Sequence, residues 1–165
     1  MWEGTTNVLA SETIRHLTRG DNLAIFGNWV ENSVSKVRNA DNKQALGSAW
    51  RLLKQKIASV ELVDALADGR QIMFTLAWLL SGLLLALDAQ RDNEEVAVEV
   101  AWRWILDGEG VPGEFAFRDI VHVGSASLTW RRPSGRERTN WDCRIVWGVD
   151  LPQDSAVGYR VESKL

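Results

Sequence analysis

The sequence is poor in the residues that stabilise small disulfide-linked or metal-linked folds. Its 165 residues include one cysteine, Cys143, and two histidines, His16 and His122, which stand far apart. A single cysteine cannot form a disulfide within the chain, and neither histidine belongs to a spacing typical of a zinc site. We therefore expect no bound metal and an intracellular protein in a reducing compartment.

Targeting and membrane signals are also scarce. No basic stretch followed by an apolar one opens the sequence, so no secretory signal is predicted. The uncharged run from Ile72 to Leu87 falls just short of the roughly 17–25 residues that span a bilayer, and Thr75, Ser81 and Gly82 interrupt it. We expect the central helix of a helical bundle here and no membrane contact, with a membrane span as the alternative.

Charge of one sign is not in excess. The formal net charge is −3, which is too balanced to attach the whole molecule to nucleic acid or to anionic lipid. A local basic patch would be needed for either partner. The composition, 45% hydrophobic and 25% charged, is that of an ordinary folded chain of one domain, with or without a small appendage.

Apolar residues recur every three or four positions in the first part of the chain, which is typical of helices that bury one face. Thr5 or Thr6 is predicted to cap a first helix, and Gly20 to follow its end. A second helix is predicted between Asp21 and the polar residues 39–42. The fold class is therefore expected to be all-α.

Three further helices are predicted. One carries the apolar stripe from Leu46 to Val60 and is expected to end at Gly69. The apolar helix covers residues 70–91, and another covers residues 93–106 before the glycine-rich stretch 107–113. Together these segments predict an up-down bundle of about five helices, which forms a domain over residues 1–110.

The remaining residues, 111–165, are predicted to form a C-terminal tail with a β-hairpin or irregular structure. Residues 127–131 and 143–147 are rich in β-forming side chains and flank the turn-like Pro133-Ser134-Gly135. The tail also holds four arginines within eight residues, next to Trp130 and Trp141: Arg131, Arg132, Arg136 and Arg138. Such a patch suits the phosphates of nucleic acid, but a solvated turn or a subunit contact is the interpretation that we favour.

Residues 2–9, Trp-Glu-Gly-Thr-Thr-Asn-Val-Leu, place a carboxylate directly before a predicted helix start. Free N–H groups and threonine hydroxyls at such a start suit an anionic or carbonyl-rich ligand, and Gly4 permits close approach of the backbone. Glu3 is then a candidate general base. The same pattern is common in ordinary capped helices, so the residues alone leave both interpretations open.

This motif, followed by a helix with Ile14-Arg15, resembles the segment that opens the last part of the C-terminal helical domain in acyl-CoA dehydrogenases. The Trp before Glu3 and the Asn-Val-Leu after the threonines are most similar to the adaptive-response (alkylation-response) branch. The resemblance implies an FAD-dependent oxidoreductase that removes two hydrogens across the α,β bond of an acyl-CoA in fatty acid metabolism. It also implies homo-oligomers built through this domain.

Carried onto this chain, the resemblance makes Glu3 the base that takes the α-proton and places Gly4 at the thioester of the substrate. Thr5, Thr6 and Asn7 match positions that contact FAD. The family's N-terminal helical and middle β-domains have no counterpart in these residues. We therefore expect a C-terminal fragment or separately encoded domain that is inactive alone. The alternative is a non-catalytic helical module for oligomerisation or DNA association.

Two other features have simpler explanations than a site. Cys143 has no recognisable histidine partner, so a buried or partly buried thiol of the tail is favoured over a catalytic nucleophile. The tryptophans at helical spacing would suit a ligand pocket, but they are more typical of a core or of a subunit interface. These tryptophans are Trp50, Trp78, Trp102 and Trp104.

Overall fold

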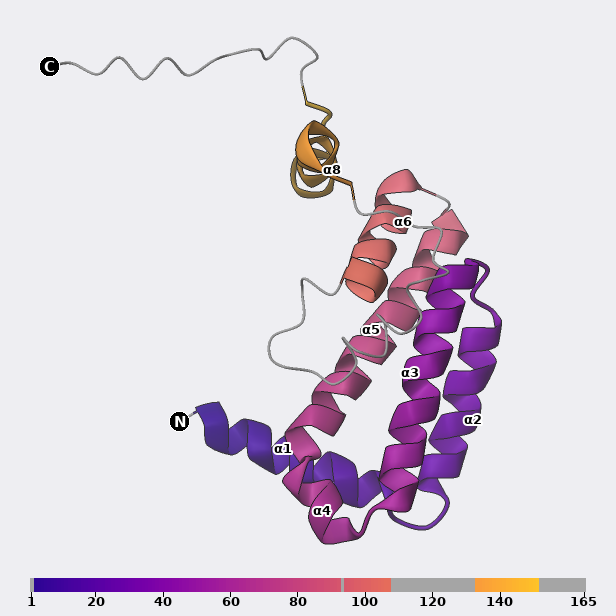
Figure 1. Cartoon of the computed structure of the whole chain (residues 1–165), viewed down its shortest axis with the longest axis vertical. Helices are drawn as coiled ribbons and strands as arrows, with labels where there is room; N and C mark the ends of the chain where they lie inside the picture. The colour runs from indigo at the N-terminus through magenta and orange to yellow at the C-terminus, as the bar shows by residue number, and fades with distance from the viewer. Residues whose placement is uncertain (1, 93, 108–132, 152–165) are drawn as a thin grey trace, which may run out of the picture. The chain divides into compact units, whose positions relative to one another are not determined.

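The computed structural model describes residues 2–92, 94–107 and 133–151. Every regular element within these ranges is a helix (Figure 1), which confirms the all-α fold class. Helices α1 to η1 belong to one unit of the chain and helix α8 belongs to another. The prediction of a domain boundary near residue 110 falls outside the described residues and stays a prediction.

Helix α1 (Trp2–Leu17) packs against α5, and a turn then leads to α2 (Asn22–Ser35). The turn contains Gly20 at φ 55°, a left-handed conformation that glycine adopts without strain. Such a glycine is typical of the position directly after a helix, where the sequence predicts Gly20. The side chain of Asn22 donates to the carbonyl of His16 across it at 2.8 Å.

Helix α3 (Ala40–Ser59) packs along α2 and begins where the polar residues 39–42 predicted a break. Asn39 is its N-cap, because its side chain accepts a hydrogen bond from the backbone N–H of Asn42 at 2.9 Å. Gln90 of α5 holds the preceding loop, accepting from Arg38 N at 3.0 Å and donating to the carbonyl of Lys36 at 3.1 Å.

The prediction that Gly69 ends the third helix is wrong. Extended backbone at Val60 and Glu61 separates α3 from a short helix, α4 (Leu62–Ala67), and Gly69 is the first residue of α5. A Cβ at Gly69 would lie 3.6 Å from the Cβ of Ala10 in α1. This glycine is therefore part of the close packing between α1 and α5.

Helix α5 (Gly69–Asp92) is the central element of the bundle, as the uncharged run predicts. It packs against α1, α3 and α4 and against the helical segment that follows it. Ile72, Leu79 and Leu83 are almost fully buried. Within the described ranges α5 is the one helix that is long and apolar enough to cross a membrane, but 44% of its apolar window is buried within the protein, as in the core helix of a bundle.

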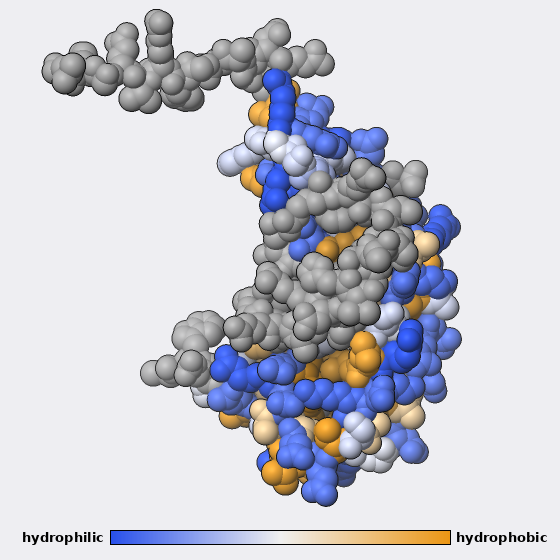
Figure 2. Space-filling view, viewed as in Figure 1, coloured by the Kyte–Doolittle hydropathy of each residue, from blue (hydrophilic) through white to orange (hydrophobic). Residues whose placement is uncertain are grey.

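Helix α6 (Glu95–Trp102) continues into a π-helical turn, η1 (Arg103–Asp107), within the range predicted for the fifth helix. The Glu99 carboxylate is buried and bonds to Nε of Arg103 at 2.8 Å, which ties α6 to η1. At the end of the bundle where α4 lies, Leu62 and Val63 are exposed, and apolar surface is visible there in Figure 2.

Helix α8 (Gly135–Trp147) corrects the predicted strand over residues 143–147. Local contacts explain the helix, because the guanidinium of Arg144 lies 4.4 Å from the ring centre of Trp141 one turn earlier. Gly148 at φ 69° then ends the helix with its N–H bonded to the carbonyl of Arg144. Residues 127–131, the other predicted strand, lie outside the described residues.

Candidate functional site

The predicted motif lies inside α1, which begins at Trp2. The prediction that Thr5 or Thr6 caps this helix is therefore wrong, because helical hydrogen bonding continues through Gly4 to residues before it. Threonine often caps a helix, but it does not have to end the hydrogen-bond pattern. Because no proline interrupts this stretch, the helical hydrogen bonds extend past both threonines. Glu3 and Gly4 thus belong to the first turn and not to a segment that precedes it.

The described residues at the start of α1 are largely exposed to solvent. Gly4, Thr5 and Asn7 are exposed and Thr6 is half-buried, while the side chain of Glu3 lies outside the described part of the chain. A Cβ added at Gly4 would meet no atom within 4 Å, so packing does not require glycine at this position. Successive side chains of a helix point about 100° apart, so those of Thr5, Thr6 and Asn7 do not converge on one point.

At the end of the motif, α1 presents two apolar side chains to solvent. Val8 is 62% exposed and Leu9 57% exposed, and both share a helix face with Thr5 at spacings of three and four residues. The opposite face, with Ala10, Ile14 and Leu17, is buried. Exposed apolar residues beside an open glycine give this end of α1 a surface suited to a partly apolar partner.

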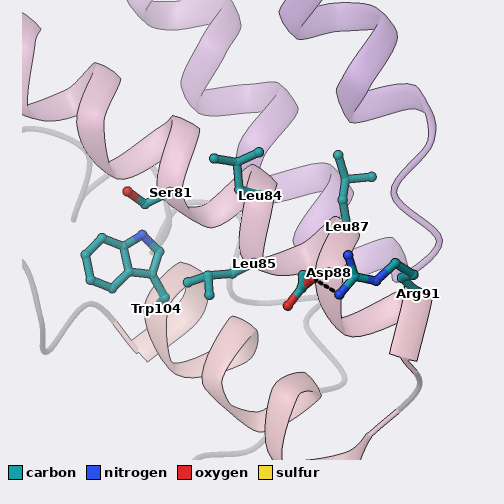
Figure 3. Close-up of a pocket in the computed structure, with 7 residues that line it drawn as sticks. All are labelled: Ser81, Leu84, Leu85, Leu87, Asp88, Arg91 and Trp104. Atoms are coloured by element: carbon teal, nitrogen blue, oxygen red, sulfur yellow. Dashed lines mark ion pairs between the residues drawn. The ribbon is translucent and has the colours of Figure 1, made fainter.

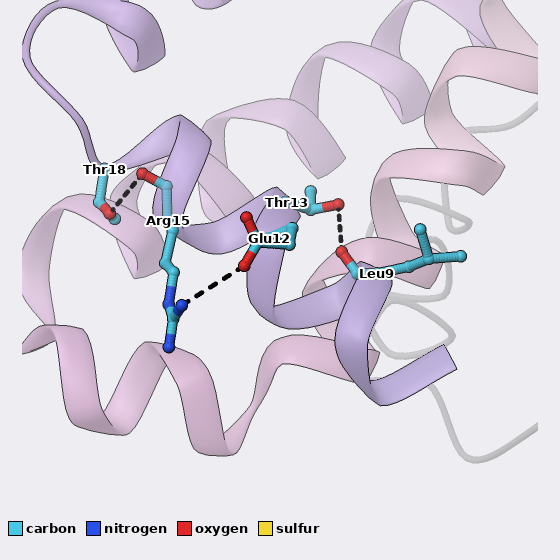
Figure 4. A network of polar contacts seen from close by, with 5 residues as sticks. All are labelled: Leu9, Glu12, Thr13, Arg15 and Thr18. Carbon is cyan, nitrogen blue, oxygen red and sulfur yellow. Dashed lines mark hydrogen bonds and ion pairs between the residues drawn. The ribbon is translucent and has the colours of Figure 1, made fainter. Parts of the chain in front are cut away.

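The polar contacts further along α1 stay within the helix (Figure 4). The hydroxyl of Thr13 donates to the carbonyl of Leu9 at 2.8 Å, and Arg15 forms an exposed ion pair with Glu12 at 3.4 Å. The hydroxyl of Thr18 caps the last carbonyls, those of Ile14 at 2.9 Å and Arg15 at 3.5 Å. These contacts hold the helix itself and leave its Val8 and Leu9 side uncovered by the residues described.

The structure places two members of the predicted basic patch on α8. Arg136 is exposed and Arg138 half-buried, and both take part in polar interactions. Arg131 and Arg132 lie outside the described residues, so the patch as a whole stays a prediction. Cys143 is a free, half-buried thiol on the same helix.

A groove that the sequence did not predict runs along α5 beside η1. It has a volume of about 690 Å³ and an apolar lining from three leucines and Trp104, with the ion pair Asp88–Arg91 at 2.8 Å near one end (Figure 3). The leucines are Leu84, Leu85 and Leu87. Leu84 is 59% exposed, so the groove is a shallow apolar surface and lacks the convergent polar groups of a catalytic pocket.

The tryptophans expected in the core are mostly there. Trp50 and Trp78 are buried in the core, while Trp102 and Trp104 are half-buried and pack against that core. Within the described ranges no cluster of three or more His, Cys, Asp or Glu side chains forms a potential metal site.

Comparison with known proteins gives one informative match. Over 124 residues the chain is 32% identical to acyl-CoA dehydrogenase family member 11 of Caenorhabditis elegans. The match covers 65% of this chain and 20% of that protein, so the chain corresponds to about a fifth of the relative's length. No protein-family model and no solved structure matches. The similarity relates the chain to the acyl-CoA dehydrogenases at a coarse level and assigns no residue a role.

Proposed function

We propose that the chain is a C-terminal part of an FAD-dependent acyl-CoA dehydrogenase-like oxidoreductase of the adaptive-response type. The observation that carries the proposal is the motif of residues 2–9 at the start of a chain whose described elements are all helices and which is similar to acyl-CoA dehydrogenase family member 11. Its reaction would be the α,β-dehydrogenation of an acyl-CoA. Assembly into homo-oligomers is part of the same proposal.

In this proposal Glu3 is the base, and its carboxylate takes and holds the α-proton of the acyl thioester. A carboxylate can do this only when hydrogen bonds polarise the thioester carbonyl and water is kept away. Gly4 supports the assignment, because the space above it is open and a substrate could lie against the backbone there. Bound FAD would accept the β-hydrogen as hydride.

The residues assigned to FAD fit part of a flavin site. Thr5 and Asn7 are exposed polar side chains, and Val8 and Leu9 beside them offer the apolar surface that a ring system needs. Since consecutive helical side chains do not converge, Thr5, Thr6 and Asn7 cannot all reach the cofactor from one side of a continuous helix. The rest of the site must come from other residues, so we propose that the 165-residue polypeptide alone does not turn over acyl-CoA.

A chimera tests the function. The chain would replace the matching segment of the nematode relative, and flavin content and acyl-CoA-dependent reduction of an artificial electron acceptor would be measured. We expect the chimera to retain FAD and activity, and Glu3→Gln to retain FAD while losing about 10²-fold or more of kcat. Glu12→Gln, an exposed glutamate on the same helix, is the matched control.

Two results would contradict the proposal. A chimera that folds but retains no FAD would show that the helices do not replace those of the relative. A Glu3→Gln chimera as active as the Glu12→Gln control would show that Glu3 is not the base. For the isolated chain, stoichiometric FAD with substrate-dependent bleaching would contradict the proposal that it is inactive alone.

A second candidate is a helical interaction module without catalysis. The exposed apolar residues Ile25 and Trp29, one turn apart on α2, favour this alternative, because adjacent exposed apolar side chains offer a patch that a partner protein can cover. Association with DNA belongs to the same alternative. Arg136→Ala combined with Arg138→Ala should then lower DNA affinity and its dependence on salt, and unchanged values would exclude a phosphate site on α8.

A further inference from the structure

A groove lies between the second half of α2 and residues 43–54 of α3, two helices that pack side by side in the bundle (Figure 1). Its volume is about 410 Å³, which falls within the roughly 300–1,000 Å³ of small-molecule pockets. Buried Val34 and Trp50 line it together with Gly47. The inner surface is therefore apolar and large enough for a small organic molecule.

Gly47 keeps this groove open. A helix with glycine at an interior position is less stable than one with alanine there. At two other helical positions, close packing explains why the residue is glycine. A Cβ at Gly82 would lie 3.0 Å from Cγ1 of Ile105, and one at Gly27 would lie 3.1 Å from Cζ2 of Trp50. At Gly47 the nearest atom would be Cγ1 of Val34 at 3.6 Å, an ordinary contact. Packing therefore does not require this glycine, and the missing side chain leaves room above α3.

Positive charge flanks the open glycine. Lys43 and Arg51 stand one helical turn before and after Gly47, and both line the groove. The side chain of Arg51 has no hydrogen bond or ion pair within the described ranges. The ammonium group of Lys43 donates to the carbonyl of Ser35 at 2.7 Å and has no carboxylate partner among the same residues.

The third cation of the groove is already neutralised. Nζ of Lys54 lies 2.8 Å from Oε1 of Glu31, which also accepts a hydrogen bond from Nε1 of Trp50 at 3.2 Å. Two positive charges without an acidic partner in the described part of the chain thus remain on one stripe of α3, on either side of an apolar opening. An anion between them would offset their mutual repulsion.

We propose that this groove binds a small organic anion, with a phosphate or sulfonate group between Lys43 and Arg51 and an apolar body over Gly47. The arginine supplies a planar pair of N–H donors and the lysine a point charge, while Val34 and Trp50 contact the apolar part. The site is separate from the motif on α1, so it does not depend on the proposed function.

Phenyl phosphate is the probe, and backbone amide NMR of the full chain is the measurement. We expect saturable shifts of the Gly47 amide and of its neighbours in α2 and α3. Arg51→Gln should weaken binding about tenfold, because it removes a charged donor to the anion. Gly47→Ala should weaken binding while the melting temperature stays equal or rises. Arg70→Gln, the same change at an exposed arginine on α5, should leave binding unaltered.

Three outcomes would overturn the proposal. One is the absence of saturable shifts around Gly47 in the folded wild-type chain. Another is equal weakening by Arg51→Gln and Arg70→Gln, which would mean that only overall charge matters. The third is inorganic phosphate binding as tightly as phenyl phosphate, because the apolar lining would then contribute nothing.

Discussion

At Glu31, hydrogen bonds from two neighbouring side chains change the pKa of the carboxyl group. Its carboxylate accepts hydrogen bonds from Lys54 and from the indole of Trp50, and these bonds, the one from Lys54 most, lower the pKa of Glu31 from its ordinary 4.5. Both charged side chains are about half exposed, so solvent weakens the interaction. The contact is nevertheless one of two polar links that join α2 to α3 at the groove, beside the hydrogen bond from Lys43 to the carbonyl of Ser35.

The direction of this shift gives a pH-dependent stability. A carboxyl group with a lowered pKa in the folded state stabilises it fully above pH 4.5, and this contribution is lost as the pH falls through the lowered value. We therefore expect Glu31→Gln to lower the melting temperature slightly at neutral pH and to have less effect in acid. Thermal unfolding from about pH 7 to about pH 3 measures this difference, and a difference that does not change with pH would refute the explanation.

Gly82 is the glycine at which an added methyl group should lower the stability of the fold most. A Cβ there would lie 3.0 Å from Ile105 and 3.2 Å from Leu46, and both of these side chains are fully buried and unable to move aside easily. Gly82→Ala should therefore destabilise the fold by about 1–3 kcal/mol. Gly47→Ala is the control, with no loss expected. Urea denaturation of the two variants would contradict this prediction if both lost stability equally.

At the scale of elements, two tryptophans join α5 to η1 through reciprocal hydrogen bonds. Nε1 of Trp78 donates to the carbonyl of Trp104, and Nε1 of Trp104 donates to the carbonyl of Trp78, each at 3.0 Å. Trp78 is 2% exposed. Both indoles therefore supply packing and a hydrogen bond at the same contact.

Trp78→Phe should be clearly destabilising. It removes one of these hydrogen bonds, leaves the carbonyl of Trp104 without its indole donor, and opens a small cavity, so we expect a loss of about 2–4 kcal/mol. Trp29→Phe, at a 48% exposed position, should cost less than about 0.5 kcal/mol. Chemical denaturation compares them, and equal losses would mean that the buried pair adds no stability.

The sequence predicts those elements whose signals are local and regular. Helix α5 follows from an uncharged apolar run, and the start of α3 follows from Asn39, whose side chain caps it. The break at Val60 and Glu61 has no such signal, because it consists of extended backbone without glycine or proline. The strand predicted over residues 143–147 is wrong because β-propensity depends on context, and the contact of Trp141 with Arg144 favours a helix.

At the scale of the molecule, the bundle and α8 differ in how they are stabilised. The bundle has a continuous buried core, whereas α8 has no buried residue. A helix of this length with no buried residue gains little from a core, so the local contacts of α8 must contribute much of its stability. Backbone amides of α8 should therefore exchange with solvent at least about 10²-fold faster than those of α5. Hydrogen exchange followed by NMR measures both, and equal protection would contradict this account.

The two candidate sites differ in how far the sequence predicts them. The motif of residues 2–9 is contiguous, so the amino-acid order alone is enough to recognise it, although its place within α1 depends on the fold. The groove at Gly47 is lined by residues of two helices. Arg51 is available to an anion there because Glu31 forms its ion pair with Lys54 and not with Arg51. The order of residues in a sequence does not show which of several lysine and arginine side chains pairs with a carboxylate in the folded protein.

The π-helical turn at η1 lets the chain carry one extra residue while Trp104 keeps its contact with α5. A π-turn accommodates one residue more than an α-helical turn of the same span. Deleting one residue from this turn would therefore leave a regular α-helical turn, and the side chains on either side of it would keep their directions. Homologues that are one residue shorter here should keep both tryptophans and have a regular helix in place of η1.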